Sequence, residues 1–225
     1  MIWLHAPHRP VVAGPTREEA YAETEREDLR RYYAVVTAID ASLGRLREHL
    51  ERLNVSDDTL LWYTSDNGPE GSAKEGQGST AGLRGRKRSL YEGGVRVPGL
   101  LVWPKQIRTP RRLGCPASTL DTLPTLAEIL GVRLAPERTL DGVSLLPLLM
   151  ADGSDKRPGQ APLPFVSPKA AALHAGRLKA IRPEPNGKWE LYDLDADRCE
   201  TQNLAAEHPQ RTAAMAAQWE AWAKR

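Results

Sequence analysis

Near the start of the chain, apolar and polar residues alternate with the period of an α-helix. Downstream of Tyr32, an apolar side chain recurs every three or four residues, at Val36, Ile39, Leu43, Leu46, Leu50 and Leu53. This spacing draws one apolar stripe along a helix of about eight turns. Further upstream, Thr16 and Glu19 have the spacing of a capping box, which predicts that a helix begins there.

Two short apolar runs predict strands of a buried sheet. One covers residues 59–64 and ends just before Asp66, Asn67 and Gly68, and the other covers residues 100–103 between two prolines. An apolar run that ends in oxygen-bearing side chains is typical of a buried parallel strand, because open α/β sheets place their ligands at the carboxyl ends of such strands. We therefore expect an α/β core of parallel strands with flanking helices.

Beyond these strands, the sequence predicts a further helix and then a linker. Ser118 is a typical N-cap residue, and Gly131 is expected to end the helix that follows it. Residues 151–168 are rich in proline and in small polar residues, as linkers are. The α/β core is accordingly expected to cover residues 1–150.

Residues 169–225 predict a small α+β subdomain. Short strands at residues 177–181 and 188–192 flank an Asn-Gly dipeptide, which is the strongest two-residue hairpin signal. A final helix is predicted from about His208. Its apolar stripe, expected to pack on the hairpin, consists of Met215, Trp219 and Trp222.

Composition and charge are those of an ordinary globular protein. The chain has 225 residues, 40% of them hydrophobic, and a formal net charge of +2, which favours neither nucleic acid nor a membrane surface as a partner. No apolar stretch reaches the roughly twenty residues of a membrane span, and the first residues lack the charged and apolar regions of a signal peptide. The two cysteines, Cys115 and Cys199, are too few to indicate a redox compartment.

The Asp66-Asn67 pair has two interpretations. Asp-Asn-Gly is by itself good turn chemistry. The apolar strand before it and the lysine-containing segment after it favour a metal site instead, because carboxylate and amide oxygens are the ligands that Ca²⁺ and Mg²⁺ prefer. A metal ion and a nearby lysine would then flank one anionic substrate group.

A basic segment bordered by glycines follows about twenty residues later. Lys87 lies there among Arg84, Arg86 and Arg88. A cluster of this kind also occurs in nucleic-acid or targeting patches, and an isolated lysine is ordinarily solvated. The apolar and glycine residues at 91–98 favour a segment embedded in the fold, whose backbone comes close to a ligand.

Two histidines, His5 and His8, lie in a proline-rich loop with the pattern His-x-Pro-His-x-Pro. Most loop histidines have no special role. Histidine nevertheless suits proton transfer, since its ordinary pKa lies close to neutral pH.

Together these segments resemble the sulfatase family of the alkaline phosphatase-like superfamily. The resemblance rests on residues 64–68, on Tyr-Glu-Gly-Gly at 91–94, on the histidine loop, and on residues 189–194 with 200–204. It extends over nearly the whole chain, but only over the later part of a sulfatase.

The resemblance implies hydrolysis of a sulfate ester and a role for each candidate residue. Asp66 and Asn67 are expected to bind a divalent metal, either Ca²⁺ or, less typically of the family, Mg²⁺. Lys87 is expected to contact the sulfate oxygens. His8 is expected to contact the sulfate and to donate a proton to the leaving oxygen, with His5 as a supporting neighbour. The implied substrate is a sulfated small molecule or glycan.

Part of the family's machinery has no counterpart in this sequence. Sulfatases make their formylglycine nucleophile from the cysteine of a Cys-x-Pro-Ser-Arg motif, and Cys115 lacks the arginine of that motif. We expect the formylglycine and two further acidic metal ligands in an N-terminal half outside this chain, and we expect the chain alone to be inactive. Full-length members of the family are expected in the periplasm or outside the cell.

Two other functions stay open at this point. A phosphatase or phosphodiesterase of the same superfamily would also use an Asp-rich metal site. A non-catalytic remnant would instead bind a sulfated glycan through Arg84, Arg86 and Lys87.

Overall fold

The computed structural model describes residues 1–75, 77–135, 139–151 and 156–225. These residues form two compact units. The first unit consists of Met1–Gly82 with Arg96–Arg108, and the second unit consists of Leu83–Val95 with Thr109–Arg225.

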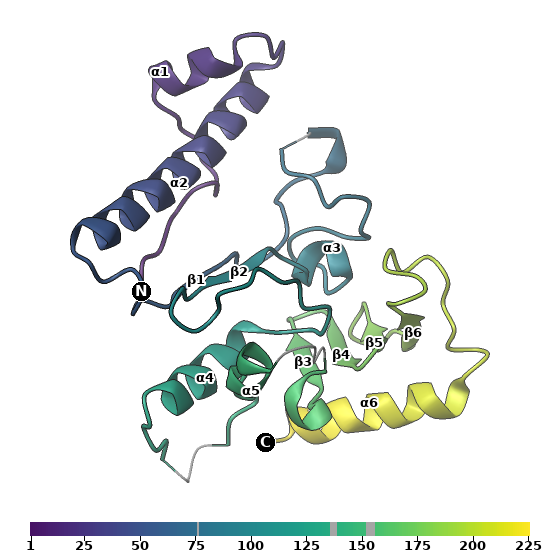
Figure 1. Cartoon of the computed structure of the whole chain (residues 1–225). Helices are drawn as coiled ribbons and strands as arrows, with labels where there is room; N and C mark the ends of the chain where they lie inside the picture. Colours follow the sequence, from purple (N-terminus) through teal and green to yellow (C-terminus); the bar gives the residue numbers. More distant parts are fainter. Residues whose placement is uncertain (76, 136–138, 152–155) are drawn as a thin grey trace. The chain divides into compact units, whose positions relative to one another are not determined.

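The first unit is built around one long helix (Figure 1). Its helical elements are α1 (Pro15–Glu18), η1 (Glu19–Tyr21), α2 (Glu27–Arg52) and η2 (Ala73–Glu75). The predicted long helix is confirmed as α2, whose acidic first turn and basic last turn complement the helix dipole. The predicted N-cap at Thr16 is wrong, because α1 already begins at Pro15, and proline is favoured in a first helical turn.

The two predicted strands form a two-stranded ladder in the first unit. β1 (Leu61–Thr64) pairs with β2 (Gly99–Val102). The ladder is antiparallel, with Leu61 opposite Val102 and Thr64 opposite Gly99, so the parallel pairing expected for these strands is wrong. An apolar run indicates that the faces of a strand are covered but carries no information on strand direction.

Burial of this ladder is also lower than predicted. Leu100 is 63% exposed and Val102 is 43% exposed. On α2, the stripe residue Val36 is 43% exposed, whereas its neighbours Ala34 and Val35 are buried. The first unit therefore contains part of a hydrophobic core whose remaining apolar faces are open.

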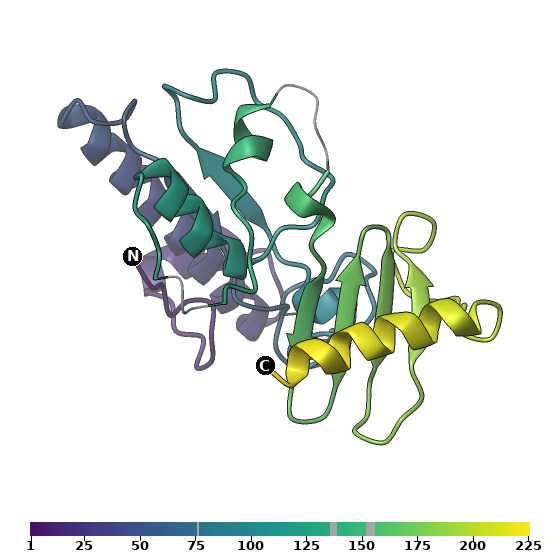
Figure 2. The same ribbon diagram turned by 90° about the horizontal axis from the view of Figure 1, so that it is seen from below.

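The second unit contains a four-stranded antiparallel sheet covered by a helix (Figure 2). The strands, in spatial order, are β3 (Leu163–Val166), β4 (Ala171–Ala175), β5 (Leu178–Arg182) and β6 (Glu190–Asp193). The two strands predicted around the Asn-Gly dipeptide are confirmed as the antiparallel pair β5 and β6, but residues 183–189 connect them, so the dipeptide is not a two-residue hairpin turn. The final helix is confirmed as α6 (Pro209–Ala223).

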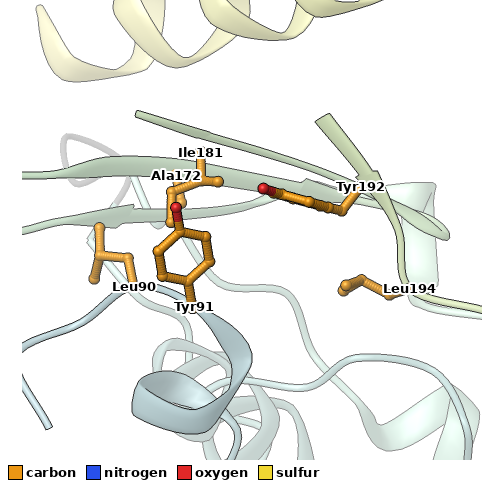
Figure 3. Packing of buried hydrophobic residues seen from close by; sticks show 6 residues of the cluster. All are labelled: Leu90, Tyr91, Ala172, Ile181, Tyr192 and Leu194. Atoms are coloured by element: carbon orange, nitrogen blue, oxygen red, sulfur yellow. The ribbon is translucent and has the colours of Figure 1, made fainter. Parts of the chain in front are cut away.

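The sheet has a hydrophobic cluster on each face because its side chains alternate. One cluster faces α6 and consists of Ala171, Leu173, Ala180, Leu191, Met215 and Trp219. The cluster on the opposite face is shown in Figure 3 and consists of Leu90, Tyr91, Ala172, Ile181, Tyr192 and Leu194. Leu90 and Tyr91 come from the segment just before α3 (Glu92–Val95). The segment that carries Lys87 is thus attached directly to this sheet.

A further part of the second unit contains short helices. They are η3 (Thr119–Asp121), α4 (Thr122–Ile129), α5 (Leu146–Met150) and η4 (Pro158–Gln160). The predicted cap at Ser118 is confirmed as a full capping box with Asp121. The predicted end of the helix is confirmed at Gly131, which has a φ of 63°.

The domain boundaries at 1–150, 151–168 and 169–225 stay predictions. Within the range expected to be linker, however, Leu163–Val166 is strand β3 and pairs with β4. No helix among the described residues combines the length and apolarity needed to cross a bilayer.

Candidate active site

The Asp66-Asn67 pair follows β1 directly in a tight turn. The Ser65 hydroxyl donates to the Asn67 carbonyl at 3.3 Å, and the Asn67 side-chain amide donates to the Gly68 carbonyl at 2.9 Å. Gly68 is buried, whereas Asp66 is exposed. The turn therefore anchors its own backbone and presents the Asp66 side chain to the surface.

The chemistry of these two side chains fits a hard cation. Within the described residues, no hydrogen bond or ion pair engages the Asp66 carboxylate, and the side chain of Asn67 uses its nitrogen, so that its amide oxygen is left as a ligand atom. No group of three or more His, Cys, Asp or Glu side chains in the described ranges is placed to hold a metal. The pair thus offers two oxygen donors of a larger ligand set.

The histidine loop lies in the same unit. The rings of His5 and His8 are 5.1 Å apart, and the His8 backbone amide donates to the His5 carbonyl at 3.0 Å. The Nδ1 atom of His8 is 2.7 Å from the Arg9 carbonyl oxygen. Because a carbonyl oxygen can accept but not donate, this contact assigns a proton to Nδ1 and leaves Nε2 as the nitrogen available to a substrate.

Next to the histidine loop lies a cavity that sequence reasoning missed. It has a volume of about 520 Å³ and is lined by Arg9, Pro10, Val11, Asp28, Arg31 and Gln77. Arg9 forms an ion pair with Glu75 and lowers the pKa of that carboxyl group. Arg26 donates to the Glu75 carbonyl at 2.6 Å, so two arginines hold η2 beside the start of α2. The sequence feature that could have indicated this cavity is Arg9, which lies inside the His-x-Pro-His-x-Pro pattern.

Lys87 lies in the second unit, in a compact loop over residues 83–89. Lys87 is half-buried, and Arg88 has a left-handed φ of 73°. The loop packs on the backbone of α3, where a Cβ atom at Gly93 would clash with the carbonyl oxygens of Arg84 and Gly85. The prediction that this segment is embedded in the fold is confirmed.

Arg84 is fixed by the same unit and is not part of an open basic patch. It donates to the Tyr192 hydroxyl at 2.9 Å and to the Glu200 carbonyl at 3.0 Å, and its guanidinium lies 3.8 Å from the centre of the Tyr91 ring. Glu190 accepts hydrogen bonds from the Tyr91 hydroxyl at 2.6 Å and from the Tyr192 hydroxyl at 2.7 Å. Burial, followed by the hydrogen bond to Glu190, raises the pKa of Tyr192 to about 12.

A buried ionic cluster in the second unit was also missed. Lys179 is 0% exposed, and its ammonium lies 2.8 Å from Glu92 and 3.0 Å from Glu200. Glu92 belongs to the Tyr-Glu-Gly-Gly segment, but nothing in the sequence distinguishes Lys179 from a surface lysine. Cys115 and Cys199 are not joined in a disulfide.

The predicted site residues are therefore divided between the units. His5, His8, Asp66 and Asn67 lie in the first unit, and Lys87 lies in the second. The convergence of these groups on one substrate stays a prediction.

Two family models match the chain. The model described as Sulfatase matches residues 1–132, and the model described as N-sulphoglucosamine sulphohydrolase, C-terminal, matches residues 85–222. Choline-sulfatase of Rhizobium meliloti (strain 1021) is 34% identical over 196 residues, which cover 81% of this chain and 34% of that protein. Arylsulfatase A of Homo sapiens is 38% identical over 153 residues, which cover 68% of this chain and 29% of that protein.

A solved structure agrees with these matches. The crystal structure of Ps i-CgsB in complex with k-i-k-neocarrahexaose superposes with a TM-score of 0.87 and 29% identity, covering 96% of this chain and 48% of that chain. This match confirms the α/β fold class expected from the sequence, including a partial core. The chain spans about a third of the curated relatives' length and about half of the solved structure. The chain belongs to the sulfatase family.

Proposed function

We propose that this chain is the later part of a sulfuric ester hydrolase and carries half of its metal site and part of its sulfate site. The observation that carries the proposal is the exposed Asp66 carboxylate, without a partner among the described residues, placed beside Asn67 at the end of β1 in a chain of this family. A turn with only a structural role would be expected to use its carboxylate within the turn.

Each candidate side chain has a role in this reaction that its chemistry fits. Asp66 and Asn67 would hold Ca²⁺, or Mg²⁺, which when bound polarises the sulfate oxygens. The Lys87 ammonium binds sulfate oxygens and stabilises the negative charge that develops on them. In its doubly protonated form, His8 donates the Nε2 proton to the departing alcohol oxygen and becomes neutral, while the Nδ1–H bond to the Arg9 carbonyl fixes the orientation of the ring.

The substrate class that we propose is a sulfated small molecule or a sulfated glycan. Support comes from the relatives, one of which is named as a choline-sulfatase and one of which is in complex with a neocarrahexaose.

A second part of the proposal is that a further N-terminal half completes the enzyme and supplies the formylglycine. The apolar faces of both units support this, because Leu100 of β2 is 63% exposed and Leu123 of α4 is 53% exposed. Side chains of this kind are normally covered in a complete core.

The test compares the 225-residue protein with the product of the same gene read in frame from further upstream. We expect no sulfate release from p-nitrophenyl sulfate by the shorter protein and turnover by the longer one. In the longer protein, Asp66→Ala and Lys87→Ala should each lower kcat/KM by about 10²-fold or more. Asp57→Ala and Lys188→Ala, at exposed positions in the same two units, serve as matched controls and should leave kcat/KM unchanged.

Three results would contradict the proposal. The first is sulfate release by the 225-residue protein alone, which would refute the missing half. The second is faster hydrolysis of p-nitrophenyl phosphate than of the sulfate, which would favour a superfamily phosphatase. The third is salt-sensitive binding to heparin without any hydrolysis by the longer protein, which would favour a glycan-binding remnant.

A further inference from the structure

The buried cluster of Lys179, Glu92 and Glu200 is an unusual feature of the second unit. Lys179 lies on β5 and is 0% exposed, Glu92 is 3% exposed and Glu200 is 0% exposed. The Lys179 ammonium donates to Glu92 Oε1 at 2.8 Å and forms an ion pair with Glu200 Oε1 at 3.0 Å. Lysine and glutamate are almost never fully buried unless they are paired. Each charge in this cluster is therefore tolerated in the interior only because an opposite charge lies next to it.

The cluster holds the first residue of α3 by two directional contacts. In addition to the contact between Lys179 and the Glu92 side chain, the Glu92 backbone amide donates to Glu200 Oε2 at 2.6 Å. An apolar contact would hold α3 against the sheet without fixing its position along the sheet. The two hydrogen bonds fix both the side chain and the backbone of Glu92, which an apolar contact cannot do.

Glu92 is connected to the Lys87 loop by the next two residues, Gly93 and Gly94, whose backbone contacts the backbone of the loop. The Gly93 amide donates to the Arg84 carbonyl at 2.7 Å. A Cβ atom at Gly94 would clash with the carbonyl oxygens of Arg86 and Ser89, which flank Lys87 on either side. The backbone of α3 therefore lies in direct contact with the backbone of the loop, so a shift of α3 must move the loop.

Glu200 is attached to the loop a second time through its backbone. Its carbonyl accepts a hydrogen bond from the Arg84 guanidinium at 3.0 Å, near the start of the loop. Burial raises the pKa of the Glu200 carboxyl group, and the Lys179 charge partly offsets that effect. The charge of Lys179 thus favours the ionised form of Glu200, which accepts the hydrogen bond from the Glu92 amide more strongly than a neutral group does.

We propose that Lys179 and Glu200 are positioning residues that hold Lys87 in place through Glu92, Gly93 and Gly94. The inference rests on the proposed function, in which Lys87 binds the sulfate group. It means that the four-stranded sheet sets the geometry of the loop that carries Lys87.

The first test uses the 225-residue chain and needs no activity. Glu200→Gln keeps a side-chain oxygen for the Glu92 amide but removes the charge that pairs with Lys179. Asp121→Asn is the matched control, because Asp121 forms another buried ion pair in the same unit, with Arg157 at 2.6 Å. Within the described residues, the Asp121 carboxylate is bonded to Ser118, Val143 and Arg157, which lie outside residues 84–95. At matched global stability, amide hydrogen exchange over residues 84–95 should be about tenfold faster in Glu200→Gln than in Asp121→Asn.

The second test uses the longer, active protein and a double-mutant cycle. Glu200→Gln should lower kcat/KM for p-nitrophenyl sulfate in the wild-type background but have little further effect in the Lys87→Ala background. A residue with only a structural role would lower kcat/KM by the same factor in both backgrounds. Asp121→Asn should show that additive behaviour.

The outcomes separate this inference from the proposed function. Unchanged exchange over residues 84–95 in Glu200→Gln, or additive effects in the cycle, would overturn the positioning role. If the longer protein does not hydrolyse the sulfate ester, the proposed function fails, and the exchange result alone then decides whether the cluster holds the loop.

Discussion

The two units are packed in different ways, and their candidate site residues are held by different forces. The buried apolar side chains of the described chain are Ala34 and Val35 in the first unit, whereas the second unit contains two clusters built on a four-stranded sheet. The buried charged residues, among them Asp121, Arg157 and Lys179, also lie in the second unit. The first unit instead has exposed ion pairs, such as that of Arg26 with Asp28.

Because of this difference, the candidate site residues of the first unit contribute little to stability, whereas the residues that support Lys87 contribute to it. Asp66 and His8 are exposed. The His8 ring is held by the Arg9 carbonyl, and the turn that carries Asp66 is held by hydrogen bonds of its neighbours Ser65 and Asn67. Lys87 lies on a loop that is packed against a well-formed core. Substitutions at the exposed groups should therefore affect function alone, whereas substitutions beneath Lys87 should affect both function and stability.

The largest effect is expected for Lys179→Met. The variant leaves the carboxylates of Glu92 and Glu200 buried without a counter-charge, so the free energy of unfolding should fall by about 3–5 kcal/mol. Urea-induced unfolding followed by tryptophan fluorescence measures this change. Lys105→Met, which removes the exposed ion pair with Asp58 from the first unit, should give no measurable change. Equal effects of the two variants would remove the contrast between the units.

A pair of leucine substitutions compares the two sheets directly. Leu173 of β4 is 1% exposed, and its truncation to alanine should lower the free energy of unfolding by about 3 kcal/mol, through lost burial and a residual cavity. Leu100 of β2 is 63% exposed, and Leu100→Ala should change the free energy of unfolding by less than about 0.5 kcal/mol. The same urea experiment measures both variants, and a costly Leu100→Ala would show that the first unit has a core of its own.

The Tyr192 hydroxyl provides a smaller effect that depends on pH. Tyr192→Phe removes a hydrogen bond donated to the Glu190 carboxylate at 2.7 Å, which should lower the free energy of unfolding by about 2 kcal/mol at neutral pH. The folded protein holds the phenol proton more tightly than the unfolded chain does, because burial and then Glu190 raise the pKa of Tyr192 from 10.0 to about 12. The contribution of this shift to stability is complete below pH 10 and is lost as the pH rises from 10 towards about 12.

Tyr192→Phe has no phenol at this position, so it lacks this pH-dependent contribution to stability. The difference in unfolding free energy between the wild type and Tyr192→Phe should accordingly be smaller at about pH 11 than at about pH 8. Urea unfolding of both proteins at the two pH values gives this difference. A difference that stays constant would place the ionisation of Tyr192 near that of a solvated tyrosine.

The sequence correctly predicted the elements whose patterns involve residues close together in the chain. The spacing of the α2 stripe, the Ser118 cap with Asp121, and the Asn-Gly dipeptide between β5 and β6 each depend on residues close together in the chain. These patterns act through backbone and nearest-neighbour contacts, which sequence spacing describes well.

The features that were missed depend on distant partners. β4 consists of Ala171–Ala175 and has little intrinsic strand propensity, so its conformation comes from pairing with β3 and β5. The burial of Lys179 likewise requires Glu92, which lies 87 positions away in the chain. The direction of β1 relative to β2 was wrong for the same reason, since it is set by the path of the intervening chain and not by either apolar run.

The smallest effect on stability, and the sharpest contrast with Lys179, is expected for Asp66→Ala. The Asp66 carboxylate is exposed and has no hydrogen bond or ion pair with the described residues, so its removal should change the free energy of unfolding by less than about 0.5 kcal/mol. In the longer protein the same variant should lose sulfate ester hydrolysis and the rise in melting temperature produced by added Ca²⁺. A destabilised Asp66→Ala that still gains stability from Ca²⁺ would show that Asp66 supports the turn and does not bind the metal. Because Lys179→Met is predicted to do the reverse, with a large loss of stability and no change in the calcium-dependent rise, the two variants together test whether chemistry and packing are separated between the units.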